Sequence, residues 1–118
     1  MPDMERRMGK EIAKQCRDEF AKKALRGDSL DQANGKLQEI WTDLKDEVRQ
    51  FIIPVDEMEE MLKASGGPTT YSELGVGADL YRDAIVHCRE MRNRFSFLDL
   101  AADAGILKDF ASKETQCV

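Results

Sequence analysis

The stretch that decides the fold runs from residue 30 to residue 52 and reads LDQANGKLQEIWTDLKDEVRQFI. Its apolar side chains recur at alternating steps of three and four residues, the spacing of one face of an α-helix. These positions are Leu30, Ala33, Leu37, Ile40, Trp41, Leu44, Val48, Phe51 and Ile52. Gly27 and Asp28 precede the stretch as a stop and a capping signal, and Pro54 disfavours helix at the residue before it. The pattern predicts a long helix that packs within a domain, with Trp41 as a core or interface anchor.

A second apolar stripe lies near the amino end and predicts a first helix that ends near Gly27. Its members recur every four residues and are Met4, Met8, Ile12, Cys16 and Phe20. A strict four-residue step drifts around a helix by about 40° each time. We therefore expect this helix to touch more than one neighbour.

Three shorter helices are predicted after Pro54. The first covers residues 56–65, the second runs from about residue 80 to residue 95, and the third covers residues 96–105. Ser96 and Asp99 have capping-box spacing at the start of the last one. Because no stretch alternates as a strand does, the predicted fold class is all-α, with about five helices packed as a bundle. The bundle is expected to be a single domain over residues 1–118.

Composition limits the class of function. The chain has 118 residues, of which 42% are hydrophobic and 35% charged, and its formal net charge is −5. That length suits one modest core and excludes a nucleotide-binding domain together with a substrate domain. Residues 1–26 hold eight basic and five acidic side chains, residues 27–65 four and ten, and residues 66–118 six and eight. The basic groups of the first helix are interleaved with acids, which indicates a solvated helix face and no nucleic-acid partner.

Signals for membrane insertion and secretion are lacking in the sequence, so we expect a cytoplasmic protein without a membrane partner. Cys16, Cys88 and Cys117 are odd in number and widely separated, which excludes a disulfide framework and a CxxC motif. We expect free thiols, with Cys117 in a loose tail.

Few residues are candidates for chemistry. His87 is the single histidine, and a catalytic iron or zinc site needs several convergent ligands, so we interpret it as structural. The glycines of Gly75-Val76-Gly77 lack the preceding strand and the third glycine of a phosphate-binding loop, and they predict a turn. We therefore predict no catalytic, metal-binding or cofactor-binding residue in this chain.

Arg92 and Arg94 leave two interpretations open. Two guanidinium groups beside a helix that starts at Ser96 are able to hold a phosphate. Asp99 and Asp103 lie within reach along that helix and would instead pair with both arginines, fixing the corner. We favour the ion pairs, which predict that loss of Arg94 destabilises the fold.

Three segments in the second half carry a resemblance to a known family. They are Gly66-Gly67-Pro68-Thr69-Thr70-Tyr71-Ser72-Glu73-Leu74-Gly75, Arg82-Asp83-Ala84, and Arg92-Asn93-Arg94-Phe95-Ser96-Phe97-Leu98-Asp99-Leu100-Ala101-Ala102-Asp103. In this order they resemble the carboxyl-terminal end of NAD(P)-dependent sn-glycerol-1-phosphate dehydrogenases, within the iron-containing alcohol dehydrogenase and dehydroquinate synthase group. The resemblance is strong from Phe51 to Leu107 and implies the terminal part of that group's all-helical domain.

The resemblance also implies what the parent protein does. Its reaction reduces dihydroxyacetone phosphate to sn-glycerol-1-phosphate with NAD(P)H, while a divalent metal polarises the carbonyl. The nucleotide-binding half and the Asp and His metal ligands of that family lie upstream of the segment seen here. The chain alone is therefore expected to hold no cofactor and to be structural and non-catalytic.

Two partners are compatible with this expectation: the amino-terminal dehydrogenase region, or a second copy in a homodimer. We expect an exposed apolar patch on the first helix to mediate contact with either, formed by Met4, Met8, Ile12 and Phe20. The alternative function is a stand-alone helical module for protein interaction or dimerisation.

Overall fold

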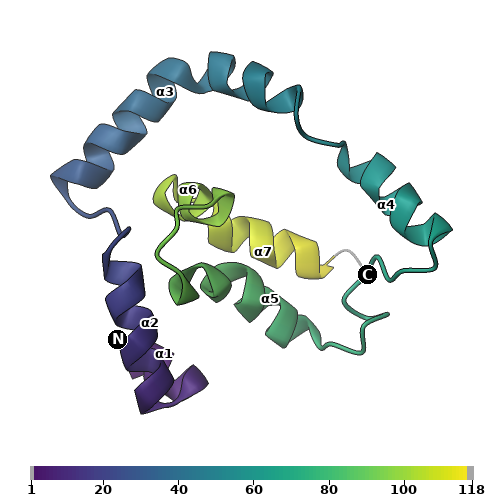
Figure 1. Cartoon of the computed structure of the whole chain (residues 1–118), viewed down its shortest axis with the longest axis horizontal. Helices are drawn as coiled ribbons and strands as arrows, with labels where there is room; N and C mark the ends of the chain where they lie inside the picture. Colours follow the sequence, from purple (N-terminus) through teal and green to yellow (C-terminus); the bar gives the residue numbers. More distant parts are fainter. Residues whose placement is uncertain (1, 117–118) are drawn as a thin grey trace.

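The computed structural model describes residues 2–116 and shows only helices, turns and irregular segments in that range. Seven α-helices and one short 3-10 helix follow one another without a strand in this part of the chain, which confirms the all-α class (Figure 1). The elements are α1 (Pro2–Met8), α2 (Lys10–Ala21), α3 (Asp28–Arg49), α4 (Val55–Ala64), α5 (Ala78–His87), η1 (Cys88–Met91), α6 (Phe97–Asp103) and α7 (Leu107–Gln116). The two helices beyond the expected five arise from a break at Gly9 and from α7.

The first expected helix is two helices, because Gly9 interrupts it. Gly9 has φ 80° and ψ 162°, a backbone conformation that residues with side chains rarely adopt. The break allows α1 to fold beside α2, where Met4 becomes fully buried against Ala13 and Cys16. Met8 packs against this small core from its edge. The prediction of one continuous helix up to Gly27 is therefore wrong.

The same folding removes most of the predicted interface patch on the first helix. Met4 is buried at 0% exposure and Phe20 at 8%, so both lie inside the fold and the prediction that they are exposed is wrong. Met8 is partly buried, and only Ile12 keeps about half of its side chain in solvent, at 52%. The physical reason is that a stripe with a four-residue period drifts around the helix, so that its residues can pack against more than one neighbour. In this chain α2 packs against both α1 and η1.

The helical body consists of α1, α2, α5, η1, α6 and α7. Within it α5 packs along α7, α2 packs against η1, and α6 contacts α5 and α7. Leu107 and Ala111 of α7 are buried at these contacts. Ahead of α5, the ring of Tyr71 stacks on that of Tyr81 with centroids 4.9 Å apart. The expected helix from residue 80 to residue 95 is shorter than predicted, since α5 ends at His87 and continues only as η1.

The arm consists of α3, α4 and the linker of residues 50–54 between them. Figure 1 shows the arm as an arc that runs around α6 and α7. Both helices were predictable from sequence and are confirmed, yet neither contains a buried residue. One hydrogen bond ties α3 to the body, in which Asn34 Nδ2 donates to the backbone carbonyl of Asp103 at 2.9 Å.

The arm makes the molecule unusually open. The radius of gyration is 16.6 Å, whereas a compact domain of this length has about 13.5 Å. The accessible surface is 9045 Å², against roughly 6,500 Å² for a compact monomer of this mass. The structure thus differs from the expected bundle at the arm, because the helix with the strongest apolar pattern lies outside the core.

Candidate functional site

The buried carboxylate of Asp99 is the centre of the best-defined polar site. Asp99 is 1% exposed and lies in the first turn of α6. The backbone N–H of Ser96 donates to Asp99 Oδ2 at 2.8 Å, and the Ser96 hydroxyl donates to the same oxygen at 2.9 Å. The first of these bonds, with the one that the Asp99 backbone N–H donates to the Ser96 hydroxyl, forms the capping box predicted from the Ser96 and Asp99 spacing, which is confirmed.

Two cations from other elements complete this site. Lys23, just beyond the end of α2, places its Nζ 2.9 Å from Asp99 Oδ2, and Arg89 of η1 places Nη1 3.1 Å from Oδ1. The Lys23 side chain is only 5% exposed. Both cations also lie over the Phe20 ring, with the Arg89 guanidinium 4.9 Å from its centroid. The carboxylate therefore fastens α2, η1 and α6 to one another.

Burial and pairing act on Asp99 in opposite directions. Removal from water by itself raises the pKa of the Asp99 carboxyl, but hydrogen bonds from Lys23, Ser96 and Arg89 outweigh it and lower the pKa below 3.8. Asp103, one turn later, has no such donor among residues 2–116, and burial raises its pKa. Asp99 thus serves as a fixed anion in the helical body.

The predicted partners of Asp99 are wrong. Lys23 and Arg89 occupy the carboxylate, while the side chains of Arg92 and Arg94 are exposed and form no ion pair with any residue in the range 2–116. Arg94 contributes its backbone carbonyl instead, which accepts a hydrogen bond from Lys23 Nζ at 3.0 Å. Sequence spacing missed these partners because both cations lie in other elements.

Arg92 and Arg94 do share a hollow. With Lys23, Arg89 and Ser96 they line a depression of about 500 Å³ beside the start of α6. Four cationic side chains thus border this basic hollow, and two of them, Lys23 and Arg89, are paired with the buried Asp99. A phosphate contact by Arg92 and Arg94 stays a prediction.

His87 belongs to a polar link between α1 and η1. Its Nδ1 lies 3.1 Å from Glu90 Oε1, and Arg7 donates to Glu90 Oε2 at 3.0 Å. Glu90 is largely buried, at 9% exposure. Among residues 2–116 no three His, Cys, Asp or Glu side chains gather as a potential metal site. The geometry gives His87 a structural contact, in line with the interpretation from sequence.

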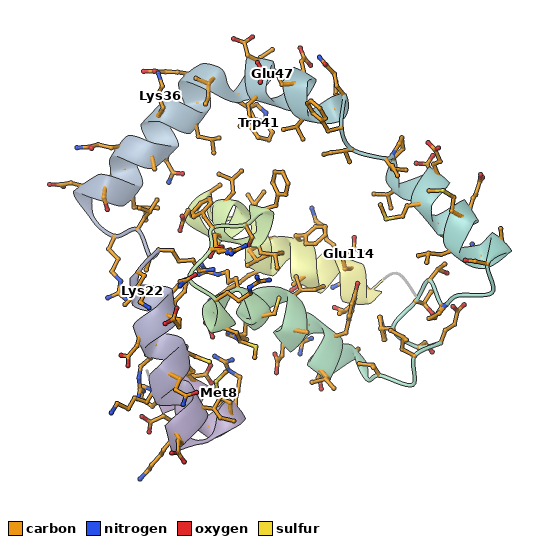
Figure 2. The ribbon with its side chains drawn as sticks, viewed as in Figure 1. Met8, Lys22, Lys36, Trp41, Glu47 and Glu114 are labelled. Carbon is orange, nitrogen blue, oxygen red and sulfur yellow. The ribbon has the colours of Figure 1, made fainter. Side chains whose placement is uncertain are left out.

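An apolar groove lies between the arm and the body. It is an open groove of about 840 Å³ with α3 on one side and α6 and the residues after it on the other. Figure 2 shows Trp41 on the inner side of the arc, facing α6 and α7, and Lys36 on the outer side. The apolar lining residues include Leu37, Trp41, Phe97, Leu100 and Ile106. An exposed apolar lining of this kind is typical of interaction sites.

Exposed apolar side chains continue from the groove along the arm. They are Ile40, Trp41, Phe51, Ile52, Ile53, Val55, Met58, Met61 and Leu62. Phe51 is 86% exposed and Val55 82%. The apolar periodicity of residues 30–52 correctly indicated a helix with one apolar face, but the packing of that face within the domain is not found, because α3 contains no buried residue.

The remaining predictions from sequence concern the cysteines, the turn at Gly75 and membrane-spanning helices. Cys16 is a buried free thiol and Cys88 an exposed one, whereas Cys117 lies outside the described residues. Gly75, at φ 70°, forms a turn as predicted. No helix within residues 2–116 has the length and apolar character needed to cross a membrane.

Comparison of the chain with protein-family models, with curated proteins and with solved structures finds no match.

Proposed function

We propose that this chain is a non-catalytic helical packing module, the terminal helical part of a protein that resembles NAD(P)-dependent sn-glycerol-1-phosphate dehydrogenases. In such a protein the NAD(P) and the divalent metal are held by the amino-terminal region, and these helices form one wall around the active site. The packing of the arm into a closed helical domain of the dehydroquinate-synthase-like type is part of this proposal. The protein acts in the cytoplasm.

The exposed apolar face of the arm is the observation that carries the proposal. Covering a large apolar side chain is worth about 1.5–3 kcal/mol, so a face bearing Trp41, Ile52 and Met61 gains stability from any polypeptide that fits it. The linker of residues 50–54 adds Phe51, Ile52 and Ile53 to this face. A monomer that keeps such a patch in solvent is uncommon.

The alternative function is a stand-alone interaction module, and one observation favours it. The helical body has its own small core at Met4, Ala13 and Cys16, and its own buried ion pairs at Asp99. It can therefore hold its shape while the arm presents a binding face.

Reconstitution of a dehydrogenase tests the proposal. The chain is co-expressed with the nucleotide-binding and metal-binding region of an intact sn-glycerol-1-phosphate dehydrogenase that lacks its own terminal helices. We expect a stable complex that oxidises NADH with dihydroxyacetone phosphate, whereas the isolated chain neither binds NADH nor turns over.

Matched variants locate the contact in this experiment. Met61→Glu, on the exposed face of the arm, should prevent complex formation. Leu80→Glu, on the exposed surface of α5, should leave the complex intact. Failure of the wild-type chain to form any complex would remove the dehydrogenase proposal and favour the stand-alone module.

A further inference from the structure

The apolar face of α4 has the chemistry to fill the groove. Met58, Met61 and Leu62 follow steps of three and one and so lie on one face of α4, where all three are exposed. The groove offers the exposed rings of Trp41 and Phe97. Methionine side chains adapt to irregular apolar surfaces and make favourable contacts with aromatic rings.

The α4 of the same chain lies away from this groove. Residues 31–41 of α3 line the groove, whereas α4 begins after Pro54, beyond the far end of α3. A helix of 22 residues spans about 33 Å, and Figure 1 shows α4 continuing along the arc past that end. The groove and α4 therefore present two complementary surfaces at separate places on one molecule.

Charge complementarity supports the same match. Asp56, Glu57, Glu59 and Glu60 make α4 strongly acidic, with Lys63 as its one basic residue. Ser96, which lines the basic hollow, directly precedes Phe97, which lines the groove, whereas the charged residue in the groove's own lining is Asp31. An acidic helix that enters the groove beside the start of α6 would therefore come near the cations of the basic hollow.

The exposed area is sufficient for a stable dimer. The accessible surface exceeds that of a compact monomer by about 2,500 Å² per chain. Two chains therefore hold about 5,000 Å² of surplus surface, and obligate homodimers bury about 2,000–5,000 Å² in total. A second copy is large enough to cover the arm.

From these observations we propose that two copies of the chain exchange their arms about a two-fold axis, so that α4 of each copy lies in the groove of the other. This inference rests on the proposed packing role of the arm and assigns the arm of the isolated chain to a second copy. The interface is isologous, since each copy supplies one groove and one α4. Met58, Met61 and Leu62 lie against the partner's Trp41 and Phe97, and the acidic side chains of α4 lie beside the partner's Arg92 and Arg94.

Light scattering and tryptophan fluorescence of the full chain test the exchange. The monomer mass is 13.4 kDa, and we expect twice this mass as concentration rises from micromolar to millimolar. Trp41 is the single tryptophan, so its emission should move to shorter wavelength as the dimer forms. A chain that stays monomeric over this range overturns the exchange, even when Trp41 is shielded, because shielding in a monomer means that its own α4 has closed on the groove.

Two substitutions separate this interface from others. Met61→Glu places a charge in the groove and should raise the dimer dissociation constant about 30-fold or more. Leu80→Glu, at an exposed apolar position of α5, should leave it unchanged. A dimer that is insensitive to Met61→Glu overturns the proposal and places the contact elsewhere.

Cross-linking distinguishes exchange from closure within one chain. One chain carries Met61→Cys and another carries Phe97→Cys, both with Cys88→Ser and Cys117→Ser, so that the introduced cysteine and the buried Cys16 are the thiols that remain. Mixing the two under a mild oxidant should give a disulfide-linked heterodimer. If the Met61→Cys chain forms disulfide-linked homodimers and the mixture contains no linked heterodimer, the pairing is contradicted.

The exchange and the proposed function fail in different ways. A monomeric chain that still reconstitutes the dehydrogenase overturns the exchange and leaves the proposed function standing. A dimer sensitive to Met61→Glu that forms no complex with the dehydrogenase region supports the exchange and contradicts the dehydrogenase role.

Discussion

The helical body and the arm use helices of similar amphipathic character, yet only the body buries its apolar residues. In the body, α2 places Ala13, Cys16 and Phe20 in the interior, whereas α3 and α4 of the arm have no buried residue. The body succeeds because α1 folds back at Gly9 and because η1 also packs against α2. The comparison teaches that an apolar period identifies a face that requires burial without identifying what covers it.

The two regions also differ in how charge is used. On the arm, Lys36 pairs with Glu39 and Lys63 with Glu59 within one helix and in solvent. In the body, the buried Asp99 pairs with cations from two other elements. Exposed pairs contribute little to stability, whereas a buried group that loses its partner is costly. Stability should therefore depend on the body far more than on the arm.

The largest effect is expected for Asp99→Ala. The substitution leaves the buried ammonium of Lys23 without its counter-ion and should lower the free energy of unfolding by about 3–5 kcal/mol. Urea denaturation followed by circular dichroism measures it. Asp79→Ala, which removes an exposed pair with Arg82, is the control and should cost less than about 1 kcal/mol. Equal losses in both variants would contradict the difference between buried and exposed charge.

Met4 in the helical body and Met61 in the arm allow the packing of the two regions to be compared directly. Met4→Ala should cost about 2–4 kcal/mol, because Met4 is fully buried between α1 and α2 and its truncation leaves a cavity. Met61→Ala, measured at concentrations where the chain is monomeric, should change stability by less than about 0.5 kcal/mol. Thermal melts of both variants decide the comparison. A comparable loss for Met61→Ala in the monomer would show that the arm is packed.

The pH dependence of stability should separate Asp99 from Asp103. The pKa of Asp99 is lowered on folding, so its stabilisation is present above pH 3.8 and is lost as the pH falls through the folded-state pKa. The stability gap between wild type and Asp99→Asn should therefore shrink in acid. The pKa of Asp103 is raised by burial, so wild type should gain on Asp103→Asn as the pH falls. Urea denaturation at a series of pH values from neutral down through pH 3.8 measures how each wild-type-to-variant difference in the free energy of unfolding changes with pH. If both differences changed in the same direction, the assignment would be contradicted.

The smallest effect is expected for Arg94→Ala. Its side chain is exposed and its contribution to the Asp99 site comes from the backbone carbonyl, which alanine retains. The free energy of unfolding should change by less than about 0.5 kcal/mol. Lys23→Ala is the matched comparison and should be several times more costly. A large loss for Arg94→Ala would restore the ion-paired corner expected from the sequence.

Much of the fold could be predicted because its signals are local. Pro54, the capping pair of Ser96 and Asp99, and the apolar period of residues 30–52 each act within a few residues, and each is found where expected. The break at Gly9 could not be predicted in this way. Gly35 lies inside α3 without interrupting it, so a glycine by itself does not decide between helix and break. At Gly9 the burial of Met4 favours the break.

The candidate site was predictable only in part. Asp99 was identified from sequence as a capping residue at the start of a helix. Its partners were not identified, because Lys23 lies 76 residues away in sequence and Arg89 lies 10 residues away in another element. Arg92 and Arg94 were nearer in sequence and were the wrong partners. Proximity along the chain therefore did not identify the partners of Asp99, because the packing of α2 against η1 brings Lys23 and Arg89 to it.

The sequence by itself determined that this chain is helical, where most of its helices begin, and which faces of them are apolar. Helix formation and capping depend on neighbours within about four residues, and the sequence contains all of those. Only the tertiary structure decided that Met4 is buried, that Lys23 and Arg89 hold Asp99, and that the arm lies outside the body. These outcomes depend on attractions between groups far apart in sequence, which act only after the chain has brought them together.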